Sequence, residues 1–260
     1  MDEKALRTAL DGLPLGGLRY AARTTSTNDD AARWTEEGAP DLALVFANEQ
    51  TAGRGRMGRR WWTPAGTALA FSLALRPAGS GQAPFNPTRL SALGGMAVCQ
   101  ALEEGYGLAA QVKWPNDVLI GGCKTAGVLA EAHWQGERLQ AAILGIGVNV
   151  TSGAVPPASE LLFPATCVEA ESGEAVDRLH LLRLILERLI AWRPKLETQE
   201  FLAAWEERLA YRGELVRIYA SAGAQEGRLA GLNDDGSLRL ISESGTLAIY
   251  AGDLSLRPLH

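Results

Sequence analysis

Hydrophobic residues in the first part of the chain follow both helical and strand-like spacing. Residues 27–38 open with hydroxyl, amide and acidic side chains and continue with small apolar residues, which predicts a helix that ends near Gly38. Residues 42–47 form a short apolar run typical of a buried strand. Residues 67–75 place a large apolar side chain at every second position, which predicts a half-buried strand. Residues 88–104 then carry apolar groups at helical spacing.

Glycine marks the turns in the middle of the chain. The strand-like apolar pieces there cover residues 112–114, 118–120, 124–132 and 139–150. Gly121 and Gly122 suit the positive φ angles of a tight hairpin turn, and a second turn is expected at 135–137. The pieces are therefore expected to form successive hairpins.

The last part of the chain changes from helices to closely spaced strands. Residues 176–192 form the strongest amphipathic pattern in the sequence, which Pro194 ends, and residues 199–209 predict a further helix. Short strands then follow between glycine-containing turns, as in a small barrel-like module of about 50 residues. We therefore expect an α/β (α+β) core over residues 1–211 and a small β domain over residues 212–260.

The composition is that of an ordinary globular protein. Of its 260 residues, 47% are hydrophobic and 21% are charged, so the chain can bury a core. The formal net charge of -5 argues against a surface made for polyanions. The three cysteines are far apart and form no CxxC pair, which predicts neither a disulfide framework nor a zinc site. Since the sequence has no recognisable signal or membrane-spanning segment, we expect a soluble cytoplasmic protein.

The most distinctive polar segment runs from Gly53 to Pro64 and is called the arginine loop below. In it, four arginines and three glycines alternate before two tryptophans. Arginine offers a planar fork of donors to phosphate or carboxylate oxygens, glycine lets the backbone approach a ligand, and indole offers an apolar surface to a ring. The loop, which connects the strands expected at 42–47 and 67–75, is therefore suited to a nucleotide.

Two other interpretations of the arginine loop are weaker. Gly53, Gly55 and Gly58 match the spacing of the dinucleotide-binding fingerprint, but Trp61 and the residues after it block the helix that this fingerprint opens. A solvent-facing basic turn is the alternative without a function, and the two adjacent tryptophans argue against it.

A second group of polar residues surrounds Pro115. Proline ends the preceding strand and restricts its neighbours, so Asn116 and Asp117 project from a defined turn. Lys124 follows within an otherwise uncharged strand, either as an edge side chain that reaches solvent or as a functional cation. The glycine hairpin is expected to bring Lys124 close to Asp117, which favours the functional interpretation.

Smaller motifs complete the candidate site. Gly145 and Gly147 fall on one face of an apolar strand, where a close-packed helix or a flat ligand would fit. Ser26-Thr27-Asn28 is a helix cap on pattern alone, and Gln50 is ambiguous by itself. The histidines are scattered and no Gly-x-Ser-x-Gly elbow occurs, which argues against a zinc enzyme and against that class of hydrolase.

Together these motifs resemble those of the biotin protein ligases. The resemblance is carried, in chain order, by Thr25-Ser26-Thr27-Asn28, Gln50 to Trp61, Lys113-Trp114-Pro115-Asn116-Asp117, Lys124-x-x-Gly127-Val128-Leu129-x-Glu131 and Gly145-Ile146-Gly147-Val148-Asn149. It covers nearly the whole chain. It implies a mixed-sheet catalytic domain of the biotin/lipoate ligase type, followed by a small SH3-like β-barrel domain.

The resemblance implies an ATP-dependent reaction in two steps. The carboxylate of biotin attacks the α-phosphorus of MgATP to give biotinyl-5′-adenylate. A lysine of a biotin carboxyl carrier domain, such as that of acetyl-CoA carboxylase, then attacks the mixed anhydride. Bringing two anions together requires nearby cations, which the arginines and the lysine supply.

By similarity, the candidate residues fall into three groups. The catalytic group is Lys124, Arg54 and Asp117, the last of which orients Lys124 or receives a proton from the incoming lysine. The biotin-binding group is Ser26, Thr27, Asn28, Gln50, Arg54, Gly55, Arg56 and Lys124. The nucleotide-binding group is Arg56, Arg59, Trp61, Asn116 and Asn149, with Trp61 over the adenine. No metal site made by the protein is expected, and Mg²⁺ accompanies the ATP.

The resemblance also leaves alternatives. Members that double as biotin-sensing repressors carry a DNA-binding domain of about 60 residues before the Ser-Thr-Asn motif. Because 25 residues precede Ser26 here, we expect the class without that domain and no specific DNA binding. Lipoate protein ligases share the catalytic architecture, but the sequence lacks their Arg-Arg-x-x-Gly-Gly-Gly loop. A homodimer is compatible with the resemblance, and no membrane partner is expected.

Overall fold

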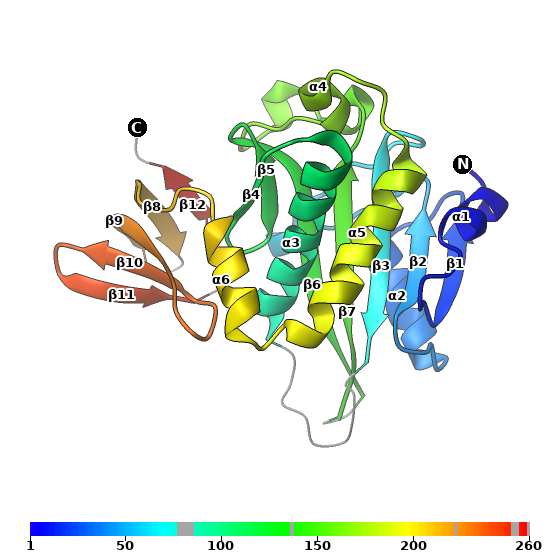
Figure 1. Cartoon of the computed structure of the whole chain (residues 1–260), viewed down its shortest axis with the longest axis horizontal. Coiled ribbons are helices and arrows are strands. Elements are labelled where there is room, and N and C mark those ends of the chain that lie inside the picture. The colour runs from blue at the N-terminus through cyan, green and yellow to red at the C-terminus, as the bar shows by residue number, and fades with distance from the viewer. Residues whose placement is uncertain (77–85, 136–137, 221–222, 251–254, 259–260) are drawn as a thin grey trace.

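A seven-stranded mixed sheet runs through the centre of the molecule (Figure 1). The structure is a computed structural model that describes residues 1–76, 86–135, 138–220, 223–250 and 255–258. The strand order is β1-β2-β3-β7-β6-β5-β4, in which β1 and β2 pair parallel and the other neighbours pair antiparallel. The strands are β1 (Gly17–Ala21), β2 (Ala43–Ala47), β3 (Ala68–Leu75), β4 (Ala110–Lys113), β5 (Asp117–Ile120), β6 (Cys123–Gln135) and β7 (Arg138–Asn149).

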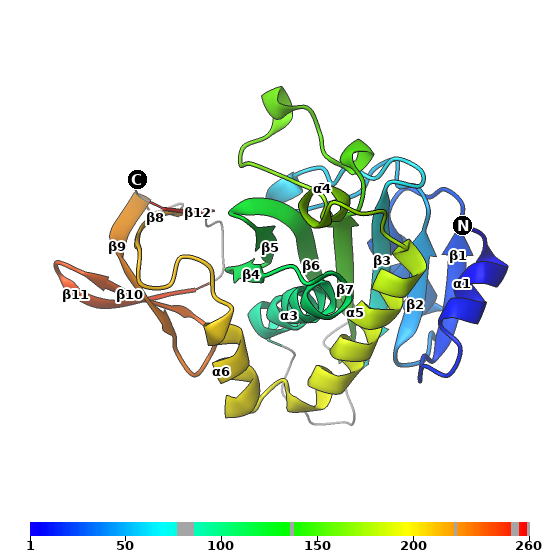
Figure 2. The ribbon, with the colours of Figure 1, turned by 45° about the horizontal axis from the view of Figure 1, so that its top comes forward.

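Helices cover both faces of this sheet. Helices α3 (Pro87–Tyr106) and α5 (Arg178–Trp192) pack together on one face (Figures 1 and 2). Helix α2 (Thr27–Glu36) packs against β2, β3 and β7 on the other face. The short helix α1 (Glu3–Ala9) contacts α5, and another short helix, α4 (Val168–Ser172), precedes α5 in the chain.

Strand β3 is buried on both faces. The alternation over residues 67–75 predicts a half-buried strand, but every residue of β3 is buried. Leu73 belongs to the main core with α3 and α5, whereas Ala74 packs in a second apolar cluster with Ala31 of α2. The half-buried prediction is therefore wrong, because α2 covers the face that carries the small residues.

Capping residues set the helix ends where the sequence predicts them. Asp177 accepts hydrogen bonds from two backbone amides at the start of α5, and Gly107 ends α3 with a φ of 63°. Pro194 lies in a 3₁₀ turn directly after α5, and α6 (Gln199–Glu207) follows.

The predicted glycine hairpin is confirmed. Gly121 and Gly122 have φ angles of 56° and 78° and join β5 to β6. The second predicted turn, at 135–137, lies largely outside the described residues. Strand β1 has no counterpart in the predictions, because its side chains are nearly all half-buried and give no alternation of apolar and polar positions.

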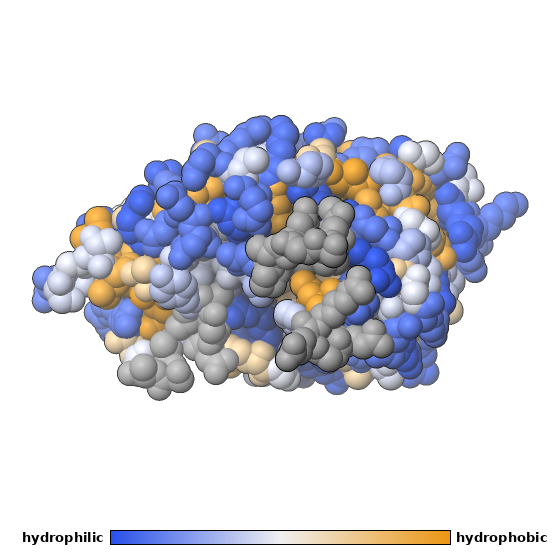
Figure 3. Space-filling model, turned by 90° about the horizontal axis from the view of Figure 1, so that it is seen from below, coloured by the Kyte–Doolittle hydropathy of each residue, from blue (hydrophilic) through white to orange (hydrophobic). Residues whose placement is uncertain are grey.

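A second sheet, of five antiparallel strands in the order β11-β10-β9-β8-β12, follows α6. Its strands are β8 (Leu215–Ala220), β9 (Gly223–Leu232), β10 (Leu238–Ser242), β11 (Gly245–Ile249) and β12 (Ser255–Pro258). The closely spaced strands predicted after residue 212 are thus confirmed. Seen from below, hydrophilic residues cover most of the described surface and hydrophobic residues form small groups (Figure 3).

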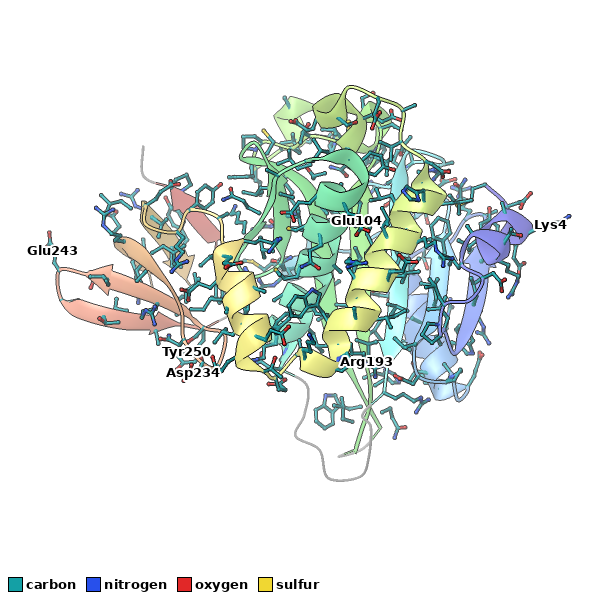
Figure 4. The ribbon with its side chains drawn as sticks, in the orientation of Figure 1. Lys4, Glu104, Arg193, Asp234, Glu243 and Tyr250 are labelled. Atoms are coloured by element: carbon teal, nitrogen blue, oxygen red, sulfur yellow. The ribbon has the colours of Figure 1, made fainter. Side chains whose placement is uncertain are left out.

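The turn between β9 and β10 fastens the second sheet to the first. Trp114 Nε1 donates to the carbonyl of Gly236 at 3.1 Å. The buried Arg89 of α3 donates to the carbonyls of Leu196 and Asp234. Figure 4 shows Asp234 beside the lower end of α6. Because Trp114 directly precedes the Pro-Asn-Asp turn, this contact also holds the turn that carries Asn116 and Asp117.

Within the described ranges, no helix combines the length and the apolar composition that crossing a membrane requires.

Cys99, Cys123 and Cys167 are free thiols, in agreement with the prediction of no disulfide. Burial raises the pKa of the Cys99 thiol well above its ordinary value, so this cysteine is a core residue and not a nucleophile.

Candidate functional site

A cavity of about 410 Å³ lies among the arginine loop, the start of α2, the middle of β6 and β7, and the segment that follows β7. All the residues that the sequence assigns to the site line it: Ser26, Thr27, Asn28, Gln50, Arg54, Gly55, Arg56, Arg59, Trp61, Asn116, Asp117, Lys124 and Asn149. The arginine loop and the segment after β7 meet above the main sheet (Figure 2), where Trp62 Nε1 donates to the carbonyl of Gly153 at 3.2 Å.

Strand alternation gives the cavity a flat floor. Val128 and Ile146 point toward α3, so their neighbours Gly127 and Gly147 face the opposite side of the sheet, where they pair across β6 and β7. The Trp61 indole lies over these glycines: a Cβ at Gly147 would lie 2.2 Å from Trp61 Nε1. Trp61 Nε1 is buried and has no hydrogen-bond partner among the described residues. Gly147 thus accommodates a flat ring, here that of a side chain.

Gly145 accommodates helix α2 instead. A Cβ there would lie 2.1 Å from Asn28 Oδ1. Asn28 is only 5% exposed. Its Oδ1 accepts a hydrogen bond from Ser72 Oγ at 2.6 Å, and its Nδ2 donates to Glu131 Oε2 at 2.6 Å. The amide of Asn28 is therefore held from both sides.

Gln50 and Thr27 extend this polar end of the cavity. Gln50 Oε1 accepts hydrogen bonds from Thr27 N at 2.8 Å and Thr27 Oγ1 at 3.1 Å, and its Nε2 donates to Thr63 Oγ1 at 3.2 Å. Ser26 stands at the N-cap of α2, but its hydroxyl makes no capping hydrogen bond and lines the cavity. We call Thr63, Gln50, Thr27, Ser72, Asn28 and Glu131 the polar network, since hydrogen bonds link each of them to the next.

A β-bulge turns Lys124 into the cavity. The pairing of β5 with β6 shifts register at Leu119, which leaves Thr125 as an extra residue in β6. The extra residue reverses the alternation of side chains, so Lys124 lies on the same face as Gly127, with its Nζ 3.4 Å from an ideal Cβ there.

Lys124 and Asp117 form an ion pair, as the hairpin predicts. The distance from Lys124 Nζ to Asp117 Oδ1 is 2.7 Å, and the two side chains are 26% and 19% exposed. Nζ also lies 5.3 Å from the centre of the Trp61 ring. Because these groups are partly shielded from water, charges here attract each other more strongly than on an open surface.

Amide side chains hold the backbone around this ion pair. Asn116 Nδ2 donates to the carbonyl of Val128 at 2.9 Å, and its Oδ1 accepts a hydrogen bond from Arg56 Nη1 at 3.2 Å. Asn149 Nδ2 donates to the carbonyl of Thr166 at 3.1 Å. Because Asn116 directly precedes Asp117, Arg56 lies at the Lys124 end of the cavity.

The arginine loop is a small hairpin. Gly55 N donates to the carbonyl of Arg59 at 2.7 Å, and Trp61 N donates to the carbonyl of Gly53 at 2.8 Å. At the tip, Met57 has a φ of 59°. Glycine is required at 53, because a Cβ there would lie 2.6 Å from the carbonyl oxygen of Trp61. The Arg59 side chain is exposed near the tip.

Arg54 lies toward the other end of the cavity from Lys124. Its guanidinium pairs with Asp29 at 2.7 Å and with Glu131 at 2.9 Å. Glu131 is seven residues beyond Lys124 in β6, which corresponds to roughly 20 Å along a strand. The sequence predicts that Arg54 acts at the reacting oxygens with Lys124; in the structure its side chain pairs with Asp29 and Glu131 and makes no contact with Lys124. Arg56, in contrast, contacts Asn116 in the turn before Asp117, the partner of Lys124.

Sequence reasoning gave no role to several residues of the site. Ser72 is the only polar residue of β3, which is a signal that could have singled it out. Glu131 is a charged residue in the otherwise uncharged middle of β6, but its partners Asn28 and Arg54 come from distant parts of the sequence. Lys113 is buried, and its Nζ lies 3.6 Å from the centre of the Phe163 ring at the cavity wall.

The two ends of the cavity differ in the chemical groups that line them. One end offers hydroxyl and amide groups, and the other offers Lys124 and Arg56 beside Asp117, with an indole on the floor between them. This suits an elongated ligand with a neutral polar head and an anionic tail. Within the described part of the chain, no three His, Cys, Asp or Glu side chains are placed to hold a metal ion.

Known proteins resemble this chain over most of its length. The model of the biotin/lipoate A/B protein ligase family matches residues 20–149. The chain is 38% identical over 242 residues to the biotin--[acetyl-CoA-carboxylase] ligase of Paracoccus denitrificans, covering 90% of this chain and 98% of that protein. It is 34% identical over 261 residues to the bifunctional ligase/repressor BirA of Bacillus subtilis, covering 98% of this chain and 79% of that protein.

A solved structure extends the likeness to the fold. The biotin protein ligase from Aquifex aeolicus in complex with biotin and ATP superposes with a TM-score of 0.80 at 31% identity, covering 94% of this chain and 99% of that one. The chain therefore belongs to the biotin/lipoate A/B protein ligase family, as the resemblance in its motifs predicts.

Proposed function

We propose that this protein is an ATP-dependent biotin protein ligase. The observation that carries the proposal is one cavity with hydroxyl and amide groups at one end and Lys124 with Arg56 at the other. Biotin has the matching polarity, because its neutral ureido ring and its carboxylate lie at opposite ends. The similarity to named biotin ligases, and to one solved with biotin and ATP, supports the same assignment.

The proposed reaction has two steps. A carboxylate oxygen of biotin attacks the α-phosphorus of ATP, the bond to the bridging oxygen breaks, and pyrophosphate leaves. The ε-amine of a carrier lysine then attacks the carbonyl carbon of the anhydride, an amide bond forms, and AMP and a proton leave. Holding the reacting atoms in line supplies much of the acceleration in each step.

The ureido head of biotin is assigned to the polar end of the cavity. Ser26 supports this role because its hydroxyl is not used to cap α2. Thr27, Asn28 and Gln50 already bond to one another or to neighbouring groups, so they would offer the head group atoms of fixed orientation. Gly55 lies in the part of the arginine loop that lines the cavity, where it would bring backbone close to this ligand.

The reacting oxygens are assigned to Lys124 and Arg56. Both cations lie at the Asp117 end of the cavity, where they would stabilise the carboxylate, the α-phosphate and the charge that develops between them. Asp117 is proposed to hold Lys124 in place, and its carboxylate, which lines the cavity, would receive the proton of the incoming lysine.

The nucleotide is assigned to Trp61, Asn116, Asn149 and Arg59. An indole inside the cavity and close to Lys124 would give adenine a ring to stack on. The two asparagines line the same end, and Arg59 would reach the phosphates from the loop tip. Mg²⁺ is proposed to enter with the phosphates, which, with one or two carboxylates, are its usual ligands in ATP-using enzymes.

The proposed acceptor is the biotin carboxyl carrier domain of acetyl-CoA carboxylase or of a related carboxylase. Similarity to a protein named as the ligase for acetyl-CoA carboxylase supports this choice. The acceptor lysine would approach where Lys124 and Asp117 line the cavity, since its amine must reach the anhydride carbon.

We also propose that the protein has two domains. Residues 1–211 would form the catalytic domain and residues 212–260 an SH3-like domain, which the change of sheet at Leu215 supports. The free thiols agree with a cytoplasmic location. Specific DNA binding is not part of the proposed function, and a gel-shift assay tests this. Sedimentation analysis tests the homodimer.

Transfer of biotin to a purified carrier domain tests the proposed function. Incorporation should require ATP and the carrier lysine, and lipoate in place of biotin should give little product. Preference for lipoate would make the protein a lipoate-type ligase on the same fold. No transfer of either acid would refute the assignment as a ligase for this acceptor.

A further inference from the structure

Glu131 joins the polar network to the arginine loop. Its Oε2 accepts hydrogen bonds from Asn28 Nδ2 at 2.6 Å and from Arg54 Nη2 at 2.9 Å, while its Oε1 accepts one from Arg54 Nη1 at 2.9 Å. The contact with Arg54 is thus bidentate, the strongest geometry for a guanidinium and a carboxylate. One carboxylate therefore contacts both the amide of α2 and the first arginine of the loop.

Glu131 determines how the Asn28 amide is turned. Asn28 Oδ1 accepts a hydrogen bond from Ser72, and Nδ2 faces the carboxylate. A rotated amide would place Oδ1 against Glu131, and two acceptors would then meet with no proton between them. Because Asn28 is 5% exposed, water would not readily replace the lost partner.

Arg54 holds the base of the arginine loop. Its backbone pairs with Arg60 across the hairpin, and its side chain spans Asp29 on α2 and Glu131 on β6. The three side chains are between 34% and 47% exposed, so each ion pair alone contributes little. The bidentate contact still fixes where the loop begins relative to the polar network.

We propose that Glu131 is a positioning residue that couples the ligand head group to the arginine loop. It turns the Asn28 amide toward the head group and, through Arg54, holds the loop over the same end of the cavity. The inference rests on the proposed function for the identity of the head group, which is the ureido ring of biotin. It extends that function, because Arg54 then acts through Glu131 while Lys124 and Arg56 act on the reacting oxygens.

Steady-state kinetics of biotin-dependent pyrophosphate exchange test the coupling. Glu131→Ala should raise the KM for biotin about tenfold, the effect of losing a hydrogen bond to a charged group, and should leave the KM for ATP and kcat within about twofold. Glu131→Gln should raise it less, because the new amide oxygen can still accept from Asn28. Glu37→Gln is the matched control, since Glu37 makes a surface ion pair with Arg19 and should leave all constants unchanged.

A double-mutant cycle decides the role of Arg54. If Arg54 acts through Glu131, the variant with both Arg54→Ala and Glu131→Ala should have about the same KM for biotin as Glu131→Ala alone. If Arg54 instead acts on the reacting oxygens, Arg54→Ala should lower kcat tenfold or more, and its effect should multiply with that of Glu131→Ala. The second result would overturn the proposal.

Trypsin digestion of the ligand-free protein tests the anchoring of the loop without any assumption about the substrate. The loop presents Arg56, Arg59 and Arg60 as cleavage sites. Glu131→Ala and Arg54→Ala should each speed cleavage there severalfold relative to Glu37→Gln, with melting temperatures that show intact folding. Equal cleavage rates would refute the anchoring. Absence of biotin-dependent exchange in the parent protein would refute the proposed function instead, and the digestion would still decide the anchoring.

Discussion

The Lys124 ammonium lies 2.7 Å from the Asp117 carboxylate, and a β-bulge is what places it there. Without the extra residue Thr125, alternation along β6 would point Lys124 toward α3 on the other face of the sheet. The cation of the cavity therefore depends on a local irregularity in one strand and on a carboxylate from its neighbour.

Lys124→Ala is expected to abolish adenylate formation and to leave the fold intact. Removing the cation takes away stabilisation of the developing charge, an effect of about a hundredfold or more on kcat. The side chain is 26% exposed, so its loss leaves little cavity in the core. Pyrophosphate exchange measures the first effect and thermal unfolding the second. Asp117→Asn, which keeps the cation, should be impaired less, and normal exchange by Lys124→Ala would contradict the assignment.

Gly147→Ala is expected to displace the Trp61 indole. The new methyl group would lie 2.2 Å from Trp61 Nε1, so the ring must move off the floor of the cavity. Tryptophan fluorescence should change, and the KM for ATP should rise if the indole stacks on adenine. Gly95→Ala is the control, because its Cβ would lie no closer than 3.4 Å to Val112, an ordinary contact. An unchanged KM for ATP in Gly147→Ala would argue that Trp61 does not cover the adenine.

Arg89→Met is expected to loosen the second sheet from the first. Arg89 is buried, and its guanidinium donates to the carbonyls of Leu196 and Asp234, which the substitution leaves without these donors. An unsatisfied buried polar group costs about 1 to 3 kcal/mol, so the free energy of unfolding should fall by about that amount. Denaturant unfolding measures it, with Lys4→Met at an exposed position as the comparison. A change of less than about 0.5 kcal/mol would show that this contact adds little to stability.

Asp235→Ala is expected to lower stability at neutral pH and not in acid. Hydrogen bonds from the Ser237 hydroxyl and the Ser237 backbone amide lower the pKa of Asp235 below its ordinary 3.8. A lowered pKa means that the folded state favours the carboxylate, so the contribution is present above the unfolded value and is lost as the pH falls through the folded one. The side chain is exposed, so the difference at pH 7 should stay below about 1 kcal/mol. Melting curves from pH 7 down to pH 2 measure it, and a difference that grows in acid would contradict the sign.

Much of the fold follows from patterns that are local in the sequence. The helix that Gly107 ends, the helix that Asp177 caps and the hairpin at Gly121 each depend on residues within a few positions. Burial of β3 on both faces was not predictable in this way, because it depends on α2, which packs there from a distant part of the chain. Strand β1 gives no periodic signal, because nearly all of its side chains are half-buried and do not alternate between an apolar and a polar face.

In the candidate site, too, contacts between residues close in the sequence could be predicted and contacts between distant residues could not. The spacing of the motifs predicts the contact between Lys124 and Asp117, because a single hairpin joins the two residues. The place of Arg54 could not be predicted, because its partner Glu131 lies 77 positions away and competes with any ligand for the guanidinium. Ser72 stands out as the polar residue of β3, but its role could not be predicted, because its partners Thr27 and Asn28 come from another element.

Biotin-dependent exchange of labelled pyrophosphate into ATP tests the central claim most directly, because it reports the joining of the two anions without needing the carrier domain. The account predicts exchange with biotin, little or none with lipoate, and none in Lys124→Ala. Exchange that does not depend on biotin, or that persists unchanged in Lys124→Ala, would contradict it.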